Sequence, residues 1–219
     1  MAIRHLAVAA ALSLTAVVAA PAQAAISISV TPNNIPLPTG QQMVVDFDNA
    51  NAAGFTFTQG PNSFVRSGAL GLQSGVSAPP PGDITNYQTV TNGGSATLTS
   101  TGLMTSFSLF MGSPDSFNSI RFEGPGFFQT LTGPQLFDPA TAFNGDQSIG
   151  RRITYDFGGA TVNKITFLST GNSFEFDDLA AGVAGVPEPT TWATMLLGVF
   201  GLGGALRTQR GRRTVAVTA

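Results

Sequence analysis

The feature that most constrains the fold is a two-residue alternation of apolar and polar side chains through the middle of the chain. Successive side chains of a strand point to opposite faces of a sheet, so this period is typical of half-buried β-strands. No stretch of the middle region shows helical periodicity over three turns. The alternation is clearest at residues 106–111, 153–157, 164–167 and 174–177, with shorter matches at 45–47, 55–57, 97–99 and 120–122.

Turn-forming residues separate these segments, as in Asn92-Gly93-Gly94 and Asn144-Gly145. Many short strands with such turns between them predict an all-β domain, a β-sandwich or jelly roll, over residues 25–185. Sixteen of the 17 phenylalanines lie in this region, and they are expected to supply most of its core.

Charge and composition exclude several functions. The chain has no cysteine, and its one histidine is His5, close to the N-terminus. A domain without histidine and cysteine cannot build a Ser-His-Asp triad, a Cys-His dyad or an ordinary zinc site. Residues 25–186 carry five basic and eleven acidic side chains, and this negative charge disfavours nucleic acid as a partner.

The N-terminal segment has the pattern of a secretory signal peptide over residues 1–24. Arg4 and His5 precede an apolar run, and Ala22 and Ala24 fit the small-residue pattern of a cleavage site. We therefore expect cleavage between Ala24 and Ala25 and export of the remaining chain.

A second signal occupies residues 186–213. Residues 190–206 are uncharged and apolar, and at 17 residues they approach the length of a membrane-spanning helix. Arginines follow in residues 207–213, which predicts a stop to translocation with the C-terminus inside the cell. The four arginines are Arg207, Arg210, Arg212 and Arg213.

The order of these features resembles the PEP-CTERM sorting signal in its PEPxxWA variant. The resemblance rests on Pro187, Glu188 and Pro189, then Trp192 and Ala193, then the apolar run and the arginine cluster. It implies a Gram-negative host, an inner-membrane precursor, and processing by an exosortase-type enzyme. It also implies a final location at the cell surface or outside the cell, in association with exopolysaccharide. Six residues follow the arginines, which departs from the usual pattern.

Three segments of the middle region resemble one family of exosortase-dependent surface proteins. They are residues 45–49, 111–118 and 172–179. The resemblance implies a galactose-binding-like or carbohydrate-module jelly roll, and it brings no catalytic residues with it.

Two acidic pairs are candidates for a calcium site: Asp46 with Asp48, and Asp177 with Asp178. Carboxylate oxygens suit calcium, and terminal strands often neighbour each other in jelly rolls. The alternative is that these residues are solvated strand ends and turn caps.

Other side chains have weaker claims to chemistry. Glu123 and Glu175 could form a glycosidase pair, although any acidic domain offers such a pair by chance. Arg151 and Arg152 could contact an anionic sugar, or one of them could point to solvent. Aromatic residues that could stack on a sugar ring, or belong to the core, are Tyr87, Phe127 and Phe128.

The sequence as a whole predicts an exported, non-enzymatic surface or matrix protein with a structural or polysaccharide-binding role. Two alternatives stay open at this point. One is a secreted glycan-acting enzyme, which the lack of histidine and tryptophan in residues 25–186 disfavours. The other is an adhesin whose tail is never cleaved and anchors it permanently in the membrane.

Overall fold

The computed structural model describes residues 25–32, 34, 36–112, 115–137 and 150–185. Within these ranges the chain forms eleven strands, all paired antiparallel in one sheet, and two short 3-10 helices. The helices are η1 (Gly68–Leu70) and η2 (Gly133–Leu136). The strands are β1 (Ser27–Pro32), β2 (Gln42–Val45), β3 (Phe55–Gln59), β4 (Ser63–Ser67), β5 (Asn86–Val90), β6 (Gly94–Met111), β7 (Asn118–Gly124), β8 (Phe127–Thr132), β9 (Arg151–Asp156), β10 (Val162–Ser169) and β11 (Phe174–Val183).

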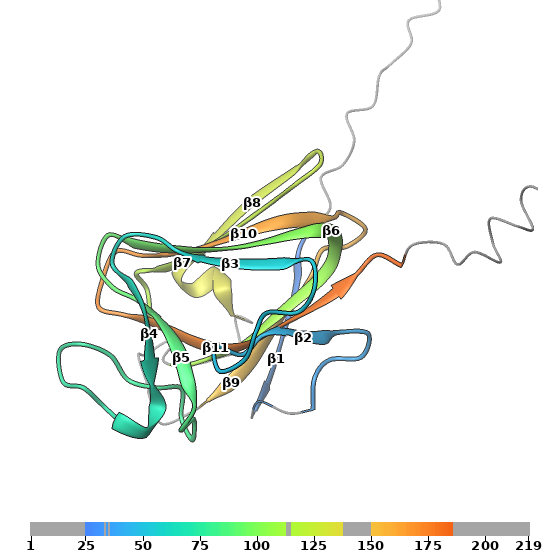
Figure 1. Ribbon diagram of the computed structural model, residues 1–219. Coiled ribbons are helices and arrows are strands. Elements are labelled where there is room, and N and C mark those ends of the chain that lie inside the picture. Colours follow the sequence, from blue (N-terminus) through green and yellow to red (C-terminus); the bar gives the residue numbers. More distant parts are fainter. Residues whose placement is uncertain (1–24, 33, 35, 113–114, 138–149, 186–219) are drawn as a thin grey trace, which may run out of the picture.

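Strand β6 holds the sheet together because it belongs to two layers. Its first half pairs with β3 and β10, and its second half pairs with β9 and β11. Figure 1 shows the result: an upper layer of β3, β6, β10, β7 and β8 lies over a lower layer of β1, β9, β6, β11, β2, β5 and β4. The predicted all-β domain is therefore confirmed, as two layers of one antiparallel sheet.

Phenylalanine and tyrosine rings fill the space between the layers. Phe167 of β10 stacks on Phe176 of β11 with ring centroids 4.3 Å apart. Phe122 of β7 meets Tyr155 of β9 at 5.1 Å. These four side chains are completely buried. The expectation that phenylalanines supply much of the core is confirmed.

The strand pattern read from the sequence differs from the structure in two ways. Residues 97–99 and 106–111, expected as separate strands, belong to the single strand β6. Phe47, expected in a strand with Val45, lies beyond the end of β2 and has a positive φ of 57° in a turn. The turn at this position is important for the acidic residues around it.

Both predicted export signals lie outside the described residues. These are the signal peptide, with Ala22 and Ala24, and the sorting signal at residues 186–213. Ala25 begins the described part of the chain. No helix within the described ranges has the length and apolar character needed to cross a bilayer.

Candidate functional site

The two acidic pairs predicted from the sequence lie next to each other in the sheet. Strand β2 pairs with β11, and Val45 is the register partner of Leu179. Asp46 directly follows the first of these residues and Asp178 directly precedes the second, so the two carboxyl groups come to the same end of the strand pair. The negative charge of Asp46 acts on Asp178.

Asp46 and Asp48 cap turns. The Asp46 carboxylate accepts hydrogen bonds from the backbone N–H groups of Asp48 and Asn49, and from the Asn49 amide at 2.8 Å. Asp48 accepts from the backbone N–H of Asn86 at 3.2 Å. Burial raises the pKa of Asp46, but the bonds from Asn49 and Asp48 outweigh this and leave the pKa below its usual value.

No group of three acidic side chains in the described part of the chain is arranged to hold a metal ion. The calcium prediction for Asp46, Asp48, Asp177 and Asp178 therefore lacks a ligand cluster, although the residues are neighbours.

A bulge in β11 lets the consecutive residues Asp177 and Asp178 reach two different loops. The pairing of β11 with β6 shifts register between Asp177 and Ala180, and Asp178 has a positive φ of 50°. Bulges of this kind re-aim side chains that would otherwise alternate between the faces of a sheet. As a result, Asp177 contacts Thr85 and Asp178 contacts Asn34.

Arg152 is the centre of a buried hydrogen-bond network next to these residues. Its side chain is completely buried on β9. Nε donates to the backbone carbonyl of Asn34 at 2.7 Å, and Nη2 donates to the Asn34 side-chain oxygen. Nη1 donates to the Ser108 hydroxyl at 2.9 Å and to the backbone carbonyl of Asp178 at 3.0 Å. The Asn34 amide in turn donates to the Asp178 carboxylate.

This network fixes Asn34 and Asp178 in place. Burial lowers the pKa of Arg152 to about 10, opposed by the charges of Asp178 and Asp177. Arg152 therefore stays protonated at neutral pH.

A second polar group links residues 83–85 to β11. The Thr85 hydroxyl donates to Asp83 and lies 3.3 Å from an Asp177 carboxyl oxygen. The Asp83 and Asp177 carboxyl groups are themselves in hydrogen-bonding contact. Burial, followed by the charge of Asp178, raises the pKa of Asp177 to about 9. Asp177 is therefore protonated at neutral pH.

The loop that carries Asp83 approaches η1 closely. The Gly68 N–H donates to the Thr85 carbonyl, and a Cβ at Gly68 would lie only 2.6 Å from the Asp83 carbonyl oxygen. Glycine is therefore needed at position 68 for this loop to close against the strand end.

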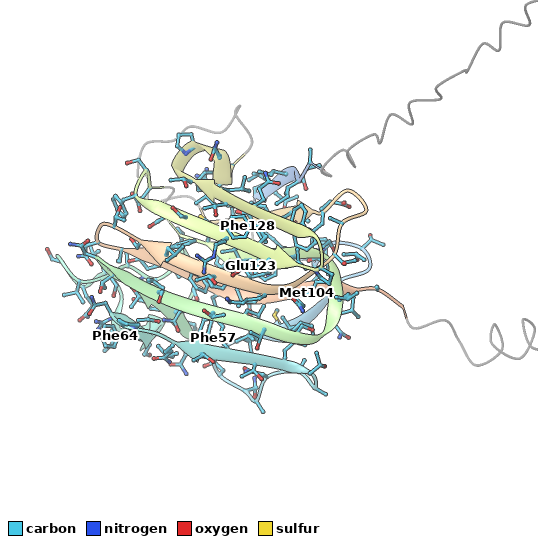
Figure 2. All side chains as sticks on the ribbon, turned by 90° about the horizontal axis from the view of Figure 1, so that it is seen from above. Phe57, Phe64, Met104, Glu123 and Phe128 are labelled. Carbon is cyan, nitrogen blue, oxygen red and sulfur yellow. The ribbon has the colours of Figure 1, made fainter. Side chains whose placement is uncertain are left out.

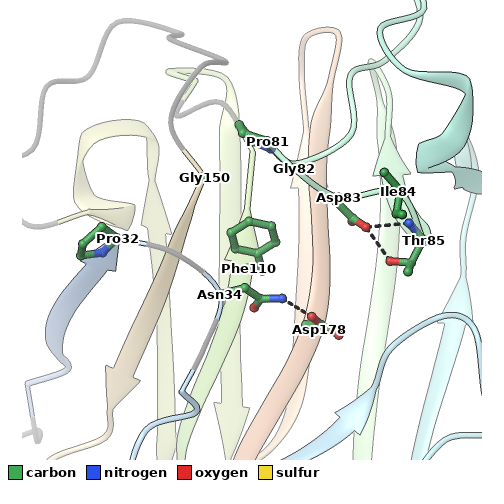
Figure 3. Close-up of a pocket in the computed structure, with 10 residues that line it drawn as sticks. All are labelled: Pro32, Asn34, Pro81, Gly82, Asp83, Ile84, Thr85, Phe110, Gly150 and Asp178. Atoms are coloured by element: carbon green, nitrogen blue, oxygen red, sulfur yellow. Dashed lines mark hydrogen bonds between the residues drawn. The ribbon is translucent and has the colours of Figure 1, made fainter.

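An open cleft with a volume of about 680 Å³ lies between these two polar groups. Figure 3 shows Asn34 and Asp178 hydrogen-bonded on one side of it, and Asp83 and Thr85 on the other. Phe110 and the exposed side chain of Ile84 add apolar surface. Among the described residues, the lining consists of Pro32, Asn34, Pro81, Gly82, Asp83, Ile84, Thr85, Phe110, Gly150 and Asp178. This combination can bind a polar molecule through directed hydrogen bonds and cover part of its surface with apolar groups.

Of the residues predicted from the sequence, Asp178 lines the cleft and Asp177 lies directly behind it. Asn34, Asp83, Thr85 and Phe110 were not predicted from the sequence. Asn34 lies in the proline-rich segment 31–40, and Asp83 and Thr85 directly follow the proline-rich segment 77–82, so this composition is the only signal near them.

The two glutamates considered as a catalytic pair lie in different layers. Glu123 is on β7 of the upper layer and forms ion pairs with Arg121 at 3.2 Å and Lys164 at 3.1 Å. Glu175 is buried on β11 of the lower layer and accepts hydrogen bonds from Ser173 and the Ala78 backbone. Burial raises the pKa of Glu175 to about 7. The two carboxylates share no hydrogen-bond partner.

The arginine and aromatic predictions are partly wrong. Arg151 and Arg152 are both buried, so neither points to solvent. Tyr87 and Phe127 belong to the buried interior and offer no ring to a sugar. Phe128, by contrast, is 57% exposed on β8.

Figure 2 shows Phe128 well separated from Phe64, the other exposed phenylalanine of the described residues. They belong to β8 and β4, at opposite ends of the main strand order, so they form no common stacking surface.

Comparisons with known proteins assign no family. No family model matches the chain, and no curated protein matches it. One similar solved structure is a family 11 carbohydrate-binding module from Clostridium thermocellum in complex with a β-1,3-1,4-mixed-linked tetrasaccharide. It is 14% identical, with a TM-score of 0.24 over 68% of this chain and 98% of that chain. Another is the family 11 module of the cellulosomal cellulase Lic26A-Cel5E from the same organism, 13% identical with a TM-score of 0.20 over 68% and 97%. Scores this low carry no argument about fold or ligand.

Proposed function

We propose that this is an exported, non-catalytic protein whose β-sandwich, of the jelly-roll type, binds polysaccharide in the cleft between Asn34 and Asp83. An exosortase-type enzyme processes it at Pro187-Glu188-Pro189, and the released domain acts at the cell surface or in the extracellular matrix. The observation that carries the binding proposal is the cleft itself, with its fixed polar groups next to apolar surface.

The size and lining of the cleft suit a short stretch of glycan. Its volume of about 680 Å³ lies within the range of roughly 300–1,000 Å³ that is typical of ligand pockets. Sugar rings present hydroxyl groups at the rim and C–H groups on the faces. Asn34, Asp83 and Asp178 can pair with the hydroxyls, and the exposed side chain of Ile84 can cover a ring face, next to the largely buried Phe110.

We expect the protein to be retained on at least one purified exopolysaccharide. Ile84→Ala should weaken retention about tenfold, because it removes the exposed apolar side chain that contacts the sugar. The variant should still fold, because Ile84 is 75% exposed and contributes little apolar burial to the fold. Affinity electrophoresis against a polysaccharide panel measures this, and thermal melting checks that the variant is folded.

Phe128→Ala is the matched control, because it removes an exposed apolar side chain outside the cleft. Loss of retention with this variant and not with Ile84→Ala would move the site to β8. Release of reducing sugar from the retained polysaccharide would instead favour the enzyme alternative.

The sorting proposal predicts that replacing Pro187, Glu188 and Pro189 with alanine traps the protein as a membrane-bound precursor. The prolines hold this segment extended, as a protease requires, and Glu188 is the only charge near the cut. The apolar run stays intact, so membrane insertion continues. Cell fractionation and intact-mass measurement should show nearly all of the variant in the membrane, heavier than the mature form by the tail.

Replacing the four arginines with glutamine should act earlier, on orientation in the membrane. A triple-alanine protein that reaches the surface with the wild-type mass would refute the sorting proposal. A wild-type protein that keeps its whole tail at the surface would support the permanently anchored adhesin.

A further inference from the structure

Acidic side chains line the cleft, whereas the basic side chains next to it are buried. The described part of its lining contains two carboxyl groups, Asp83 and Asp178, and no lysine or arginine. Asp177 adds a third carboxyl directly behind them, in contact with Asp83. An incoming ligand therefore meets acidic groups at both walls.

Two arginines lie next to these walls, and neither is available to a ligand. Arg151 follows the lining residue Gly150, pairs in register with Pro32 and is only 4% exposed. Arg152 is completely buried, and each of its side-chain nitrogens already donates a hydrogen bond within the protein. Its partners are Asn34, Ser108 and the Asp178 carbonyl. Arg152 thus positions the cleft residues and cannot form the bidentate pair with a sugar carboxylate that an exposed arginine would offer.

The other basic side chains of the described residues are also engaged away from the cleft lining. Arg121 and Lys164 form ion pairs with Glu123 on the upper layer. Arg66 lies over the Phe64 ring at 5.6 Å on β4. None of the three lines the cleft.

From this arrangement we infer that the cleft selects glycans without acidic groups and rejects chains of uronic acids. The inference rests on the proposed polysaccharide-binding function and names its substrate class. Asp83 and Asp178 present carboxyl oxygens that can accept hydrogen bonds from sugar hydroxyls. A uronate carboxylate in the same position faces these acidic groups, which repel it, and no basic side chain of the described residues is accessible there to offset the repulsion.

Matched glycan pairs test the inference on the whole protein. Each pair consists of a polyuronate and the same chain after carboxyl reduction, so the members differ only at C6. Suitable chains are polygalacturonate, polymannuronate and glucuronan. We expect at least one reduced chain to bind, about tenfold or more tightly than its polyuronate partner, at 50 mM salt. Salt should narrow the difference, because it screens the repulsion.

Two isosteric variants connect the selectivity to the cleft. Asp83→Asn and Asp178→Asn each keep an acceptor oxygen for Thr85 or Asn34 and remove a negative charge. Each should reduce the difference between the members of a pair severalfold. Glu123→Gln removes one charge from the upper layer and should leave the difference unchanged.

The outcomes separate the inference from the proposed function. Equal or tighter binding of a polyuronate overturns the inference and leaves polysaccharide binding intact. Polyuronate binding that needs millimolar calcium and disappears in chelator also overturns it, since the cleft would then recognise acids through a cation. Binding of neither member of any pair overturns the inference, and the proposed function falls with it if the wider polysaccharide panel also shows no retention.

Discussion

Replacement of Arg152 by methionine is expected to lower the free energy of unfolding by about 3–5 kcal/mol. Methionine fills a similar volume but donates no hydrogen bond. It leaves four acceptors without their partner: the carbonyl and side-chain oxygens of Asn34, the Ser108 hydroxyl and the Asp178 carbonyl. Leaving a buried acceptor unpaired costs about 1–3 kcal/mol. Urea unfolding, monitored by far-ultraviolet circular dichroism of the backbone, measures this loss of stability.

Arg152→Lys is the informative companion variant. It keeps the positive charge, but its single ammonium group cannot reach all four acceptors, so we expect a loss of about half that size. Equal losses for lysine and methionine would show that hydrogen-bond geometry, and not charge, fixes the site. A methionine variant as stable as the wild type would contradict the network described here.

The sequence predicted the layers of this fold better than their connections. Alternation identifies strands with one buried face, such as β9 and β10, because the period of the side chains and the period of burial coincide. It missed β1, β4, β5 and β8, and of these β4 and β8 lie at the ends of the main strand order. Phe64, Val65 and Phe128 are exposed there, so the burial pattern of these strands does not follow their apolar residues.

It also could not show that β6 is continuous. The middle of β6, around Thr101, Gly102 and Leu103, is exposed where the strand crosses from one layer to the other. A local pattern reads such a segment as a break between two strands. Only the pairing with both β10 and β11 reveals one strand.

The candidate site could likewise be predicted from the sequence only in part. The proximity of Asp46 to Asp178 could be anticipated, because the first and last strands of such domains are often neighbours. Asn34 and Asp83 could not be found, because each lies in a loop and reaches the site through long-range contacts to Arg152 and Asp177. The burial of Arg152 was equally hidden, since its neighbour Arg151 has the same charge and nothing local distinguishes them.

Two buried carboxyl groups determine how stability depends on pH. Burial raises the pKa of Glu175 to about 7, and burial together with the charges of Asp178 and Asp83 raises the pKa of Asp177 to about 9. In the unfolded chain such groups titrate near pH 4. The folded protein therefore binds more protons than the unfolded chain above pH 4, and the free energy of unfolding must fall as the pH rises.

We therefore expect the protein to be about 3 kcal/mol or more less stable at pH 8 than at pH 5, since each such carboxyl contributes a slope of roughly 1.4 kcal/mol per pH unit. The melting temperature should fall by about 6–12 °C over this range. Calorimetry measures this fall, and chelator is added so that divalent cations cannot neutralise the carboxyl groups in place of protons.

Asp177→Asn and Glu175→Gln should each raise stability at pH 8 and flatten the dependence of stability on pH, because a neutral amide replaces a group that must otherwise ionise in the interior. Glu123→Gln should keep the slope above pH 5: burial raises the pKa of Glu123, but Lys164 and Arg121 lower it further, to below its usual value. A melting temperature that rises between pH 5 and pH 8 would mean that Asp177 and Glu175 are ionised in the folded protein, and that a charge other than a proton balances them.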